Sequence, residues 1–214
     1  MNVIILGATG QISSYLIERL LNETTAQLTL YGHHVTQRIT VIDDQREHLV
    51  DGDILDEATL NQAMVGQDFV FLNTPTAEAM NATAAAMKKA GIRRLVISGT
   101  IGLYNEVGGK FGEWGKSMMA YFTNRQPERD AIAALDQDNA IDYTYVRMSM
   151  LYNNAAKTDY TLVPFGTPVT GAQVSRQAVA HFITDMVKAP TTHQNENVAI
   201  IETGSENLAK PSFY

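Results

Sequence analysis

The feature that most constrains the fold is the N-terminal stretch MNVIILGATGQISSYLIERLL, in which a short apolar run leads directly into a glycine-rich turn. Residues 3–6 are all apolar and mostly β-branched, which is typical of a parallel strand buried on both faces. After the turn, apolar residues recur at helical spacing from Ile12 to Leu21. A strand, a tight glycine turn and an amphipathic helix in this order predict the start of a βαβ unit.

The rest of the chain repeats this alternation of short apolar runs and helical segments. Strands are expected at residues 27–31, 48–53, 68–73, 94–99, 141–147 and 198–201, and helices at 57–64, 76–90, from 127 onward and at 174–188. Residues 36–47 are polar and fit neither pattern. Because helices that link successive parallel strands form right-handed crossovers, the sequence predicts an α/β fold with a doubly wound parallel sheet and helices on both faces.

Composition limits the classes of protein to which the chain can belong. Its 214 residues, 45% hydrophobic and 18% charged, suit a single domain over 1–214 with a substantial core. The absence of cysteine excludes disulfides and thiolate chemistry, and no cluster of metal ligands is visible. A net charge of −7 argues against direct nucleic-acid readout. No apolar run approaches the roughly 20 residues of a membrane span, so we expect a cytoplasmic protein, monomeric or homodimeric, with a small-molecule substrate.

The glycine turn, Gly7-Ala8-Thr9-Gly10-Gln11-Ile12-Ser13, indicates a dinucleotide site more than an ordinary structural turn. In such a loop Gly7 makes the tight turn, Gly10 lets the backbone approach a pyrophosphate, and the helix N-terminus supplies amide donors. The position of the usual third glycine holds Ser13. Because that position mainly serves helix–strand packing, it tolerates a small residue, and we expect the serine hydroxyl to face the phosphates.

The end of the second strand favours NADP over NAD, with NAD possible. A typical NAD site has a carboxylate there for the ribose 2′-hydroxyl, whereas this chain has His33 and His34, with Arg38 shortly after. His34 is interpreted as a solvated loop residue. The two adjacent histidines do not suggest a metal site, because neighbours on an extended segment point to opposite faces. Asp53, after the third strand, either receives the adenine amino group or caps its own turn.

The set of motifs resembles the atypical short-chain dehydrogenase/reductases. Those that carry the resemblance are Gly7-Ala8-Thr9-Gly10, Gly52-Asp53-Ile54-Leu55-Asp56, Asn73-Thr74-Pro75, Ser98-Gly99-Thr100, Gly102 to Glu106, Gly109 to Trp114, Asp142 to Arg147 and Val174-Ser175-Arg176. They follow one another in the family's order over essentially the whole chain. The resemblance is greatest to the small bacterial NAD(P)H-binding branch, related to NmrA-like proteins and to biliverdin reductase B.

The resemblance implies a Rossmann-like fold with NAD(P) along the carboxyl edge of the sheet. Carried over by position, the pyrophosphate residues are Gly7, Thr9, Gly10, Gln11 and Ile12. His33 is expected to contact the 2′-phosphate, at a position where relatives often have arginine. Asp53 and Ile54 flank adenine, Asn73 and Thr74 approach the ribose, Ser98 lies beside the nicotinamide, and Arg147 lies near the carboxamide. Met148 stands where relatives commonly have proline.

A catalytic acid is harder to assign. Classical members pair tyrosine and lysine four residues apart, so that the ammonium lowers the phenol pKa, and this pair is absent. The nearest match, Tyr121 with Arg125, precedes Pro127, and packing of Tyr121 in an apolar stripe is the preferred interpretation. Tyr104 is the better candidate beside Ser98, because its loop is expected to overhang the nicotinamide. Aromatic packing of Tyr104 and proton supply from solvent remain alternatives.

The substrate-side portion is expected at about 99–125 and 148–175. Candidate lining residues are Ser149, Leu151 and Asn153, with Tyr160 and Phe165 as lining or satellite core. The resemblance implies an NAD(P)H-dependent oxidoreductase that reduces a small carbonyl, quinone or flavin-type acceptor by hydride transfer. The alternative is a non-catalytic, NmrA-like dinucleotide-binding redox sensor. A nucleotide-sugar epimerase or dehydratase is disfavoured, since the chain is short and lacks the tyrosine–lysine pair.

Overall fold

A computed structural model describes residues 1–119 and 125–214. Its centre is an eight-stranded sheet with the order β3-β2-β1-β4-β5-β6-β10-β8, in which the edge strand β8 is antiparallel and the other pairs are parallel. The strands are β1 (Asn2–Leu6), β2 (Gln27–Gly32), β3 (Glu47–Asp51), β4 (Phe69–Leu72), β5 (Arg94–Thr100), β6 (Asp142–Met148), β8 (Thr161–Pro164) and β10 (Glu196–Ile201). A separate pair joins β7 (Met150–Tyr152) and β9 (Gln173–Ser175).

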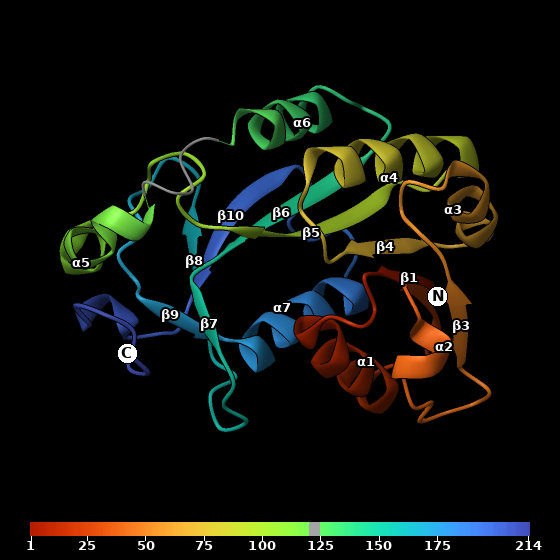
Figure 1. The fold of residues 1–214 in the computed structure, drawn as a ribbon, viewed down its shortest axis with the longest axis horizontal. Coiled ribbons are helices and arrows are strands. Elements are labelled where there is room, and N and C mark those ends of the chain that lie inside the picture. Colours follow the sequence, from red (N-terminus) through yellow and green to blue (C-terminus); the bar gives the residue numbers. More distant parts are fainter. Residues whose placement is uncertain (120–124) are drawn as a thin grey trace.

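Helices cover both faces of the sheet, as Figure 1 shows. One face carries α1 (Gln11–Glu23), α2 (Val35–Arg38) and α7 (Arg176–Lys188). The other carries α3 (Glu57–Met64), α4 (Ala77–Ala90) and α6 (Gln126–Asp136), while α5 (Gly109–Met119) lies beyond the sheet with β7, β9 and the C-terminus. The predicted doubly wound α/β fold is therefore confirmed.

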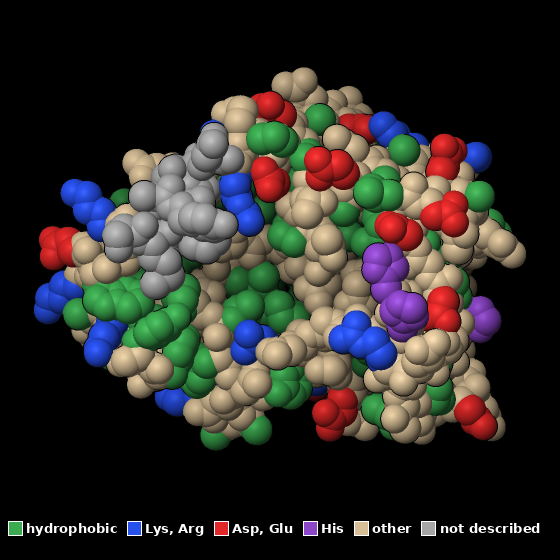
Figure 2. All heavy atoms as spheres, viewed as in Figure 1, with side chains coloured by type: hydrophobic (Ala, Val, Ile, Leu, Met, Phe, Trp, Pro, Cys, Tyr) green, Lys and Arg blue, Asp and Glu red, His purple; other side chains and the backbone are tan. Residues whose placement is uncertain are grey.

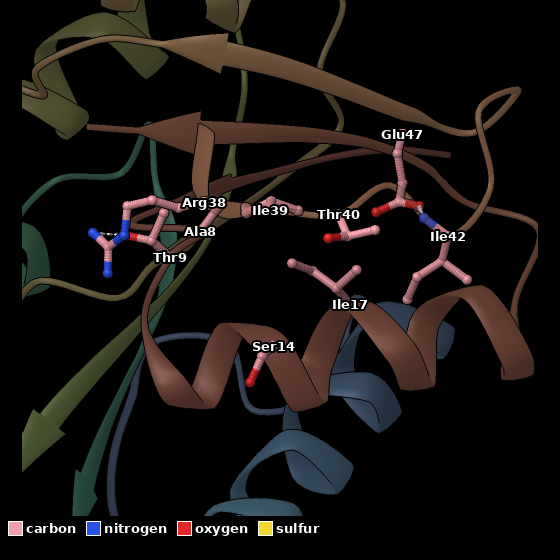
Figure 3. Close-up of a pocket in the computed structure, with 9 residues that line it drawn as sticks. All are labelled: Ala8, Thr9, Ser14, Ile17, Arg38, Ile39, Thr40, Ile42 and Glu47. Atoms are coloured by element: carbon pink, nitrogen blue, oxygen red, sulfur yellow. Dashed lines mark hydrogen bonds between the residues drawn. The ribbon is translucent and has the colours of Figure 1, made fainter. Parts of the chain in front are cut away.

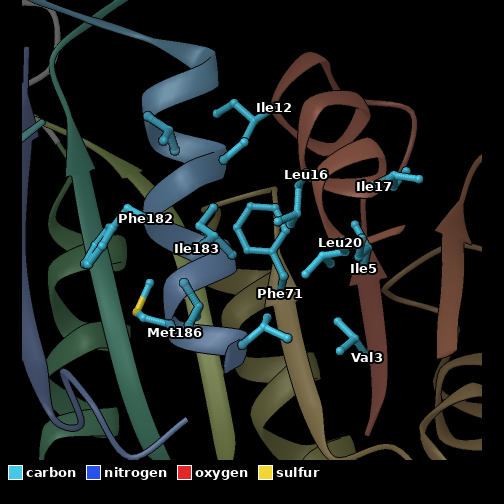
Figure 4. Packing of buried hydrophobic residues seen from close by; sticks show 14 of the residues in the cluster. Val3, Ile5, Ile12, Leu16, Ile17, Leu20, Phe71, Phe182, Ile183 and Met186 are labelled. Carbon is cyan, nitrogen blue, oxygen red and sulfur yellow. The ribbon is translucent and has the colours of Figure 1, made fainter. Parts of the chain in front are cut away.

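The core explains why the strand runs are apolar throughout. Along β1, Val3 and Ile5 pack toward α1 and α7, whereas Ile4 and Leu6 pack toward α3 and α4. Figure 4 shows the first of these clusters, where the apolar faces of the two helices meet over the sheet. Its labelled members are Val3, Ile5, Ile12, Leu16, Ile17, Leu20, Phe71, Phe182, Ile183 and Met186, all of them buried.

The helix ends follow local chemistry. Side chains of Asp56, Thr76 and Ser175 cap the starts of α3, α4 and α7. Gly91 ends α4 in the left-handed conformation, at φ +74°, as its position after the alanine-rich run predicts. Within the described ranges, no helix is long and apolar enough to cross a membrane.

Some elements differ from the sequence expectation. The segment predicted as a helix over 174–188 begins with strand β9, and α7 starts only at Arg176. The polar stretch 36–47 contains most of the one-turn helix α2, and α5 forms in a stretch for which the sequence predicted no helix. Helix α5 is anchored by the fully buried Phe111, which belongs to a separate apolar cluster next to β10.

Candidate functional site

The sheet order creates a crevice at the carboxyl ends of β1 and β4. From β1 the sheet extends through β2 to β3 on one side and through β4 and β5 on the other. Ligands of open α/β sheets bind at such a reversal of strand order, because the flanking crossovers lie on opposite faces there. The residues that directly follow these two strands are Gly7 and Asn73. The backbone N–H of Asn73 donates to the Leu6 carbonyl at 2.9 Å.

Two glycines shape the turn for different reasons. Gly7 adopts φ +83°, a conformation that favours glycine, and its amide donates to the Tyr31 carbonyl at 2.9 Å. Gly10 has ordinary angles of φ −74° and ψ 153°. However, a Cβ on Gly10 would lie 2.4 Å from Asn73 Nδ2. The close approach that requires glycine at this position is therefore made by Asn73 of the protein itself.

The N-terminus of α1 is open to an anion. Gly10 is its N-cap residue and provides no side-chain cap, in contrast to the capped starts of α3, α4 and α7. The first backbone bond of the helix runs from the Ser14 amide to the Gly10 carbonyl at 3.1 Å. The amides of Gln11 and Ile12 therefore precede the regular hydrogen-bond ladder of the helix, as an anion-binding first turn requires.

Ser13 does not face the phosphates, contrary to expectation. Its side chain is fully buried, and Oγ donates to the Gly7 carbonyl at 2.9 Å. Asn73 Nδ2 donates to Ser13 Oγ at 2.9 Å, and Ser98 Oγ donates to Asn73 Oδ1 at 3.0 Å. A polar chain therefore runs from Ser98 through Asn73 and Ser13 to the glycine turn. Both ends of the Asn73 amide, which was expected at the ribose, are engaged by serines.

A cavity of about 450 Å³ lies beside the glycine turn. It brings together seven of the predicted cofactor residues: Gly7, Thr9, His33, Arg38, Asp53, Ile54 and Thr74. Gly32, Gly52, Leu55, Thr76, Glu78 and Ala79 complete the lining. These residues follow β1, β2, β3 and β4, whose carboxyl ends meet at one edge of the sheet. Its position and size suit an adenosine moiety.

Basic side chains stand at the mouth of this cavity. His34, at φ 54°, starts the single turn of α2, which returns Arg38 to the glycine turn. Arg38 Nη1 donates a hydrogen bond to Thr9 Oγ1 at 3.3 Å. His33 Nε2 lies 3.4 Å from Asp53 Oδ2, and both side chains are more than half exposed. The predicted pair of His33 and Arg38 is therefore assembled on one cavity.

Asp53 caps its own turn, the simpler of its two predicted roles. Oδ1 of Asp53 accepts from the Leu55 amide at 2.9 Å. The turn is also held from below by Tyr31, a fully buried residue that the sequence reasoning missed. The Tyr31 phenol donates to the Asp53 carbonyl at 2.7 Å, and burial raises the pKa of Tyr31 to about 12. The phenol therefore stays protonated and keeps this hydrogen bond at neutral pH.

A second, smaller cavity of about 230 Å³ adjoins the first at Thr9 and Arg38 (Figure 3). Apolar groups of Ile17, Ile39 and neighbours line it. At its far end the Glu47 carboxylate accepts from the amides of Ile42 and Asp43 at 2.7 Å each, which holds the loop before β3. The Arg38 guanidinium in Figure 3 lies beside Thr9 and points away from the other lining residues. Its charge is thus directed to the glycine turn.

Arg147 is not available to a carboxamide in this arrangement. Ser98 pairs with Val146 in the sheet register, and Val146 packs toward α1 and α7. Arg147, the next residue, points to the opposite face, where it is fully buried. Its Nη1 lies 2.6 Å from Glu106 Oε1, and its Nε donates to Asn197 Oδ1 at 2.7 Å. The alternation of side chains along β6 therefore separates Arg147 from Ser98.

Tyr104 lies with Arg147 and not with Ser98. Its hydroxyl accepts from Asn197 Nδ2 at 3.1 Å, and its ring packs edge-on against Phe165 with centroids 4.9 Å apart. Tyr104 also packs against the cluster on the α3, α4 and α6 face. Burial raises the pKa of its phenol above the ordinary value. The structure thus does not bring together the two predicted catalytic residues.

The predicted substrate residues are distributed differently. Ser149 is buried and donates to the Gly171 carbonyl at 2.7 Å, so its hydroxyl serves the fold. Leu151 packs against the cluster of α1 and α7, on the side that Ser98 faces. Asn153 is exposed and accepts from Arg176 Nη1 at 3.0 Å. Arg176, the first residue of α7, was noted only as part of a motif, and burial lowers its pKa.

The other residues proposed from the sequence for the substrate side or for catalysis either pack elsewhere or lie outside the described residues. Tyr160 donates to Asp185 at 3.1 Å and packs on Phe182, as a satellite-core residue does. Phe165 is 56% exposed and covers Tyr104. Tyr121 lies outside the described residues. In the part of the chain that is described, no group of three or more potential metal ligands occurs.

Comparison with known proteins identifies the family. The model of the NAD(P)H-binding family matches residues 7–190, a range that contains the glycine turn and the large cavity. The chain belongs to the NAD(P)H-binding family. The predicted NAD(P) cofactor is therefore confirmed at the level of the family. A comparison with curated proteins gave no significant match.

Solved structures of similar proteins agree with this family. A short-chain dehydrogenase/reductase from Veillonella parvula DSM 2008, in complex with NADP, shares 32% identity over 99% of each chain with a TM-score of 0.89. A Rossmann-fold NAD(P)-binding family protein from Shigella flexneri shares 30% identity over 95% of this chain and 94% of that one, with a TM-score of 0.77. The anaerobilin reductase ChuY from Escherichia coli O157:H7 shares the fold, at 20% identity over 95% and 98% of the two chains and a TM-score of 0.75.

The surface is hollowed on one face (Figure 2). On the face seen in Figure 2, a hollow lies between the part that carries α1 and α2 and the part that carries α5, with hydrophobic side chains on its floor. At the glycine turn and the large cavity, the donors are backbone amides at a helix start, an arginine and a histidine. This donor set fits the phosphates of a dinucleotide, so the residues present are compatible with the family's cofactor.

Proposed function

We propose that this chain is an NADP(H)-dependent reductase of the atypical short-chain dehydrogenase/reductase type, which transfers hydride to a small carbonyl, quinone or flavin-type acceptor. The observation that carries the proposal is the continuity of the site. The large cavity, lined by His33 and Arg38, lies beside the glycine turn. Hydrogen bonds through Ser13 and Asn73 link this turn to Ser98. The adenosine and nicotinamide ends of one dinucleotide would occupy these two places.

The chain's own residues would hold the cofactor as follows. The turn from Gly7 to Gly10 and the amides of Gln11 and Ile12 at the start of α1 would bind the pyrophosphate. His33 and Arg38 would meet the ribose 2′-phosphate, since both are cationic or donor groups at the cavity mouth. Asp53 and Ile54 would flank adenine. The bound nicotinamide would supply the hydride, which is chemistry that the protein orients and does not itself perform.

Preference for NADP over NAD rests on the end of β2. The only carboxylates that line the large cavity among the described residues are Asp53 and Glu78, which follow other strands. Arg38 and His33 occupy the place after β2. The Veillonella parvula protein, at 32% identity, was crystallised with NADP, which supports the same choice here.

The proton that accompanies the hydride would come from solvent. Tyr104 and Arg147 lie on the opposite face of the sheet from Ser98, engaged with Asn197 and Glu106. An acceptor placed beside Ser98 would therefore lie on the other side of the sheet from this phenol. The acceptor would instead meet the side of the site formed by Leu151, Asn153 and the half-buried cation Arg176.

Oxidation of NADPH by a panel of quinones, flavins and aldehydes tests this function. The near-ultraviolet absorbance of the reduced nicotinamide should fall only when enzyme and a suitable acceptor are both present. Arg38→Ala should lower the rate with NADPH at sub-saturating concentration and leave the rate with NADH nearly unchanged. Tight binding of NADPH without acceptor-dependent oxidation throughout the panel would instead favour a dinucleotide-binding sensor.

A further inference from the structure

The hydrogen bonds around Asn73 have a fixed direction. A backbone carbonyl can only accept, so the 2.9 Å contact between Ser13 Oγ and the Gly7 carbonyl uses the single hydroxyl proton of Ser13. Ser13 Oγ can then only accept from its other neighbour. The neighbour at 2.9 Å must therefore be the amide nitrogen of Asn73, which orients the whole side-chain amide.

The hydroxyl proton of Ser98 also has a fixed partner. With Nδ2 facing Ser13, the oxygen of the Asn73 amide faces Ser98 at 3.0 Å. An amide oxygen carries no proton, so Ser98 must be the donor. In the reverse orientation, Asn73 Oδ1 would meet a lone pair of Ser13, and that buried contact would be repulsive. Ser13 is fully buried and Ser98 is 3% exposed, so water does not readily replace either bond.

We infer that Ser98 acts toward the cofactor only as a hydrogen-bond acceptor, and that Asn73 and Ser13 are positioning residues that impose this polarity. The inference rests on the proposed function, which places the nicotinamide end beside Ser98. An acceptor at this position selects the N–H of the nicotinamide carboxamide. It cannot protonate a substrate or stabilise a developing oxyanion, because its one proton is committed to Asn73.

Ser13, at the position of the usual third glycine, therefore has a role in setting this polarity. Glycine or alanine there would leave Asn73 Nδ2 without its acceptor, and the amide could then turn over. Turned over, Asn73 would donate to Ser98 and free the Ser98 proton for the site. Ser13 thus determines the polarity of a group with which it has no direct hydrogen bond in the structure.

Binding of a nicotinamide analogue distinguishes an acceptor from a donor. The 3-acetylpyridine analogue of NADPH keeps the carbonyl but has a methyl group in place of the carboxamide NH2. If Ser98 only accepts, the protein should bind NADPH about five-fold more tightly than the analogue. This ratio corresponds to the loss of one hydrogen bond worth about 1 kcal/mol. The ratio of the two dissociation constants, measured by fluorescence or calorimetry, needs no turnover.

Three variants complete the test. Ser98→Ala should reduce the ratio to about one, and Ser13→Ala should reduce it toward one while Ser98 remains in place. Ser14→Ala is the matched control. The neighbouring Ser14 hydroxyl donates to the Gln11 carbonyl at 2.8 Å and takes no part in the hydrogen bonds that link Ser13, Asn73 and Ser98. This variant should keep the wild-type ratio. Equal binding of NADPH and the analogue to the wild type would overturn the inference and leave the proposed function intact.

Unfolding tests the hydrogen-bond chain without any cofactor. Ser13→Ala and Ser98→Ala should be non-additive in their effect on the denaturant midpoint, since both act through Asn73. Additive effects would refute the coupling. Failure of the wild type to bind either NADPH or the analogue, with the coupling present, would refute the proposed function and with it the carboxamide contact.

Discussion

Replacement of Gly10 by alanine probes the contact between the glycine turn and Asn73. The backbone angles of Gly10, φ −74° and ψ 153°, are ordinary for alanine, so the change introduces no backbone strain. Its effect comes from the new Cβ, which would lie 2.4 Å from Asn73 Nδ2. Ordinary van der Waals contact begins at 3.4 Å, so the Asn73 amide must move by about 1 Å.

The structure allows the cost of this movement to be estimated. A shift of about 1 Å breaks or badly weakens the bonds of Asn73 to Ser13 and Ser98, now 2.9 and 3.0 Å long. Each bond is worth about 1 kcal/mol, and residual crowding adds about 1 kcal/mol. Alanine also lowers the conformational entropy of the unfolded chain, which stabilises the folded protein by about 0.5 kcal/mol. We expect Gly10→Ala to lower the free energy of unfolding by about 2.5 kcal/mol, and the melting temperature by about 5–10 °C.

Chemical denaturation of the protein without cofactor measures this loss. Gly108→Ala is the control, because a Cβ there would meet Pro168 at 3.5 Å, an ordinary contact. In an Asn73→Ala background the clash is removed, so the further cost of Gly10→Ala should nearly vanish. If Gly10→Ala is as stable as Gly108→Ala, the contact with Asn73 does not explain the glycine.

Other variants test the two faces of the site. Arg38→Ala should weaken NADPH binding by about ten-fold or more and leave NADH binding nearly unchanged, because a charge-assisted contact is worth about 1.5–3 kcal/mol; equal losses for both nucleotides in calorimetry would contradict the 2′-phosphate assignment. Tyr104→Phe should leave the rate of NADPH oxidation unchanged, since its hydroxyl meets Asn197; a loss of about 100-fold would restore it as the catalytic acid. Glu106→Gln should lower the free energy of unfolding by about 3 kcal/mol, because it leaves the buried Arg147 charge unpaired; an unchanged denaturant midpoint would refute that role.

The sequence predicted what depends on local pattern. Apolar runs and helical periodicity located the strands and helices of the alternating fold, and Gly91 marked the end of α4. The cavity residues were also predictable, because residues that follow parallel strands meet at one edge of the sheet. His33, Asp53 and Thr74 are far apart in the chain and line one cavity for this reason.

What the sequence did not predict depends on tertiary contacts. Tyr104 follows Ser98 by only six residues, yet the fold of its loop takes it to the opposite face. Arg147 was assigned by position in a motif, whereas strand alternation turns it away from Ser98. The Ser13 hydroxyl could serve a ligand or a carbonyl, and only the packing of α1 on β4 decides between them.

A calorimetric titration of the wild-type protein with NADPH tests whether the glycine turn and its cavity form a dinucleotide site. We expect one NADPH per chain, with a dissociation constant well below about 1 mM, which is a binding free energy more favourable than about −4 kcal/mol. Prior saturation with adenosine 2′,5′-bisphosphate should prevent this binding, because that fragment fills the cavity of Arg38 and His33. Absence of binding, or binding that the fragment does not displace, would contradict the dinucleotide site described for this chain.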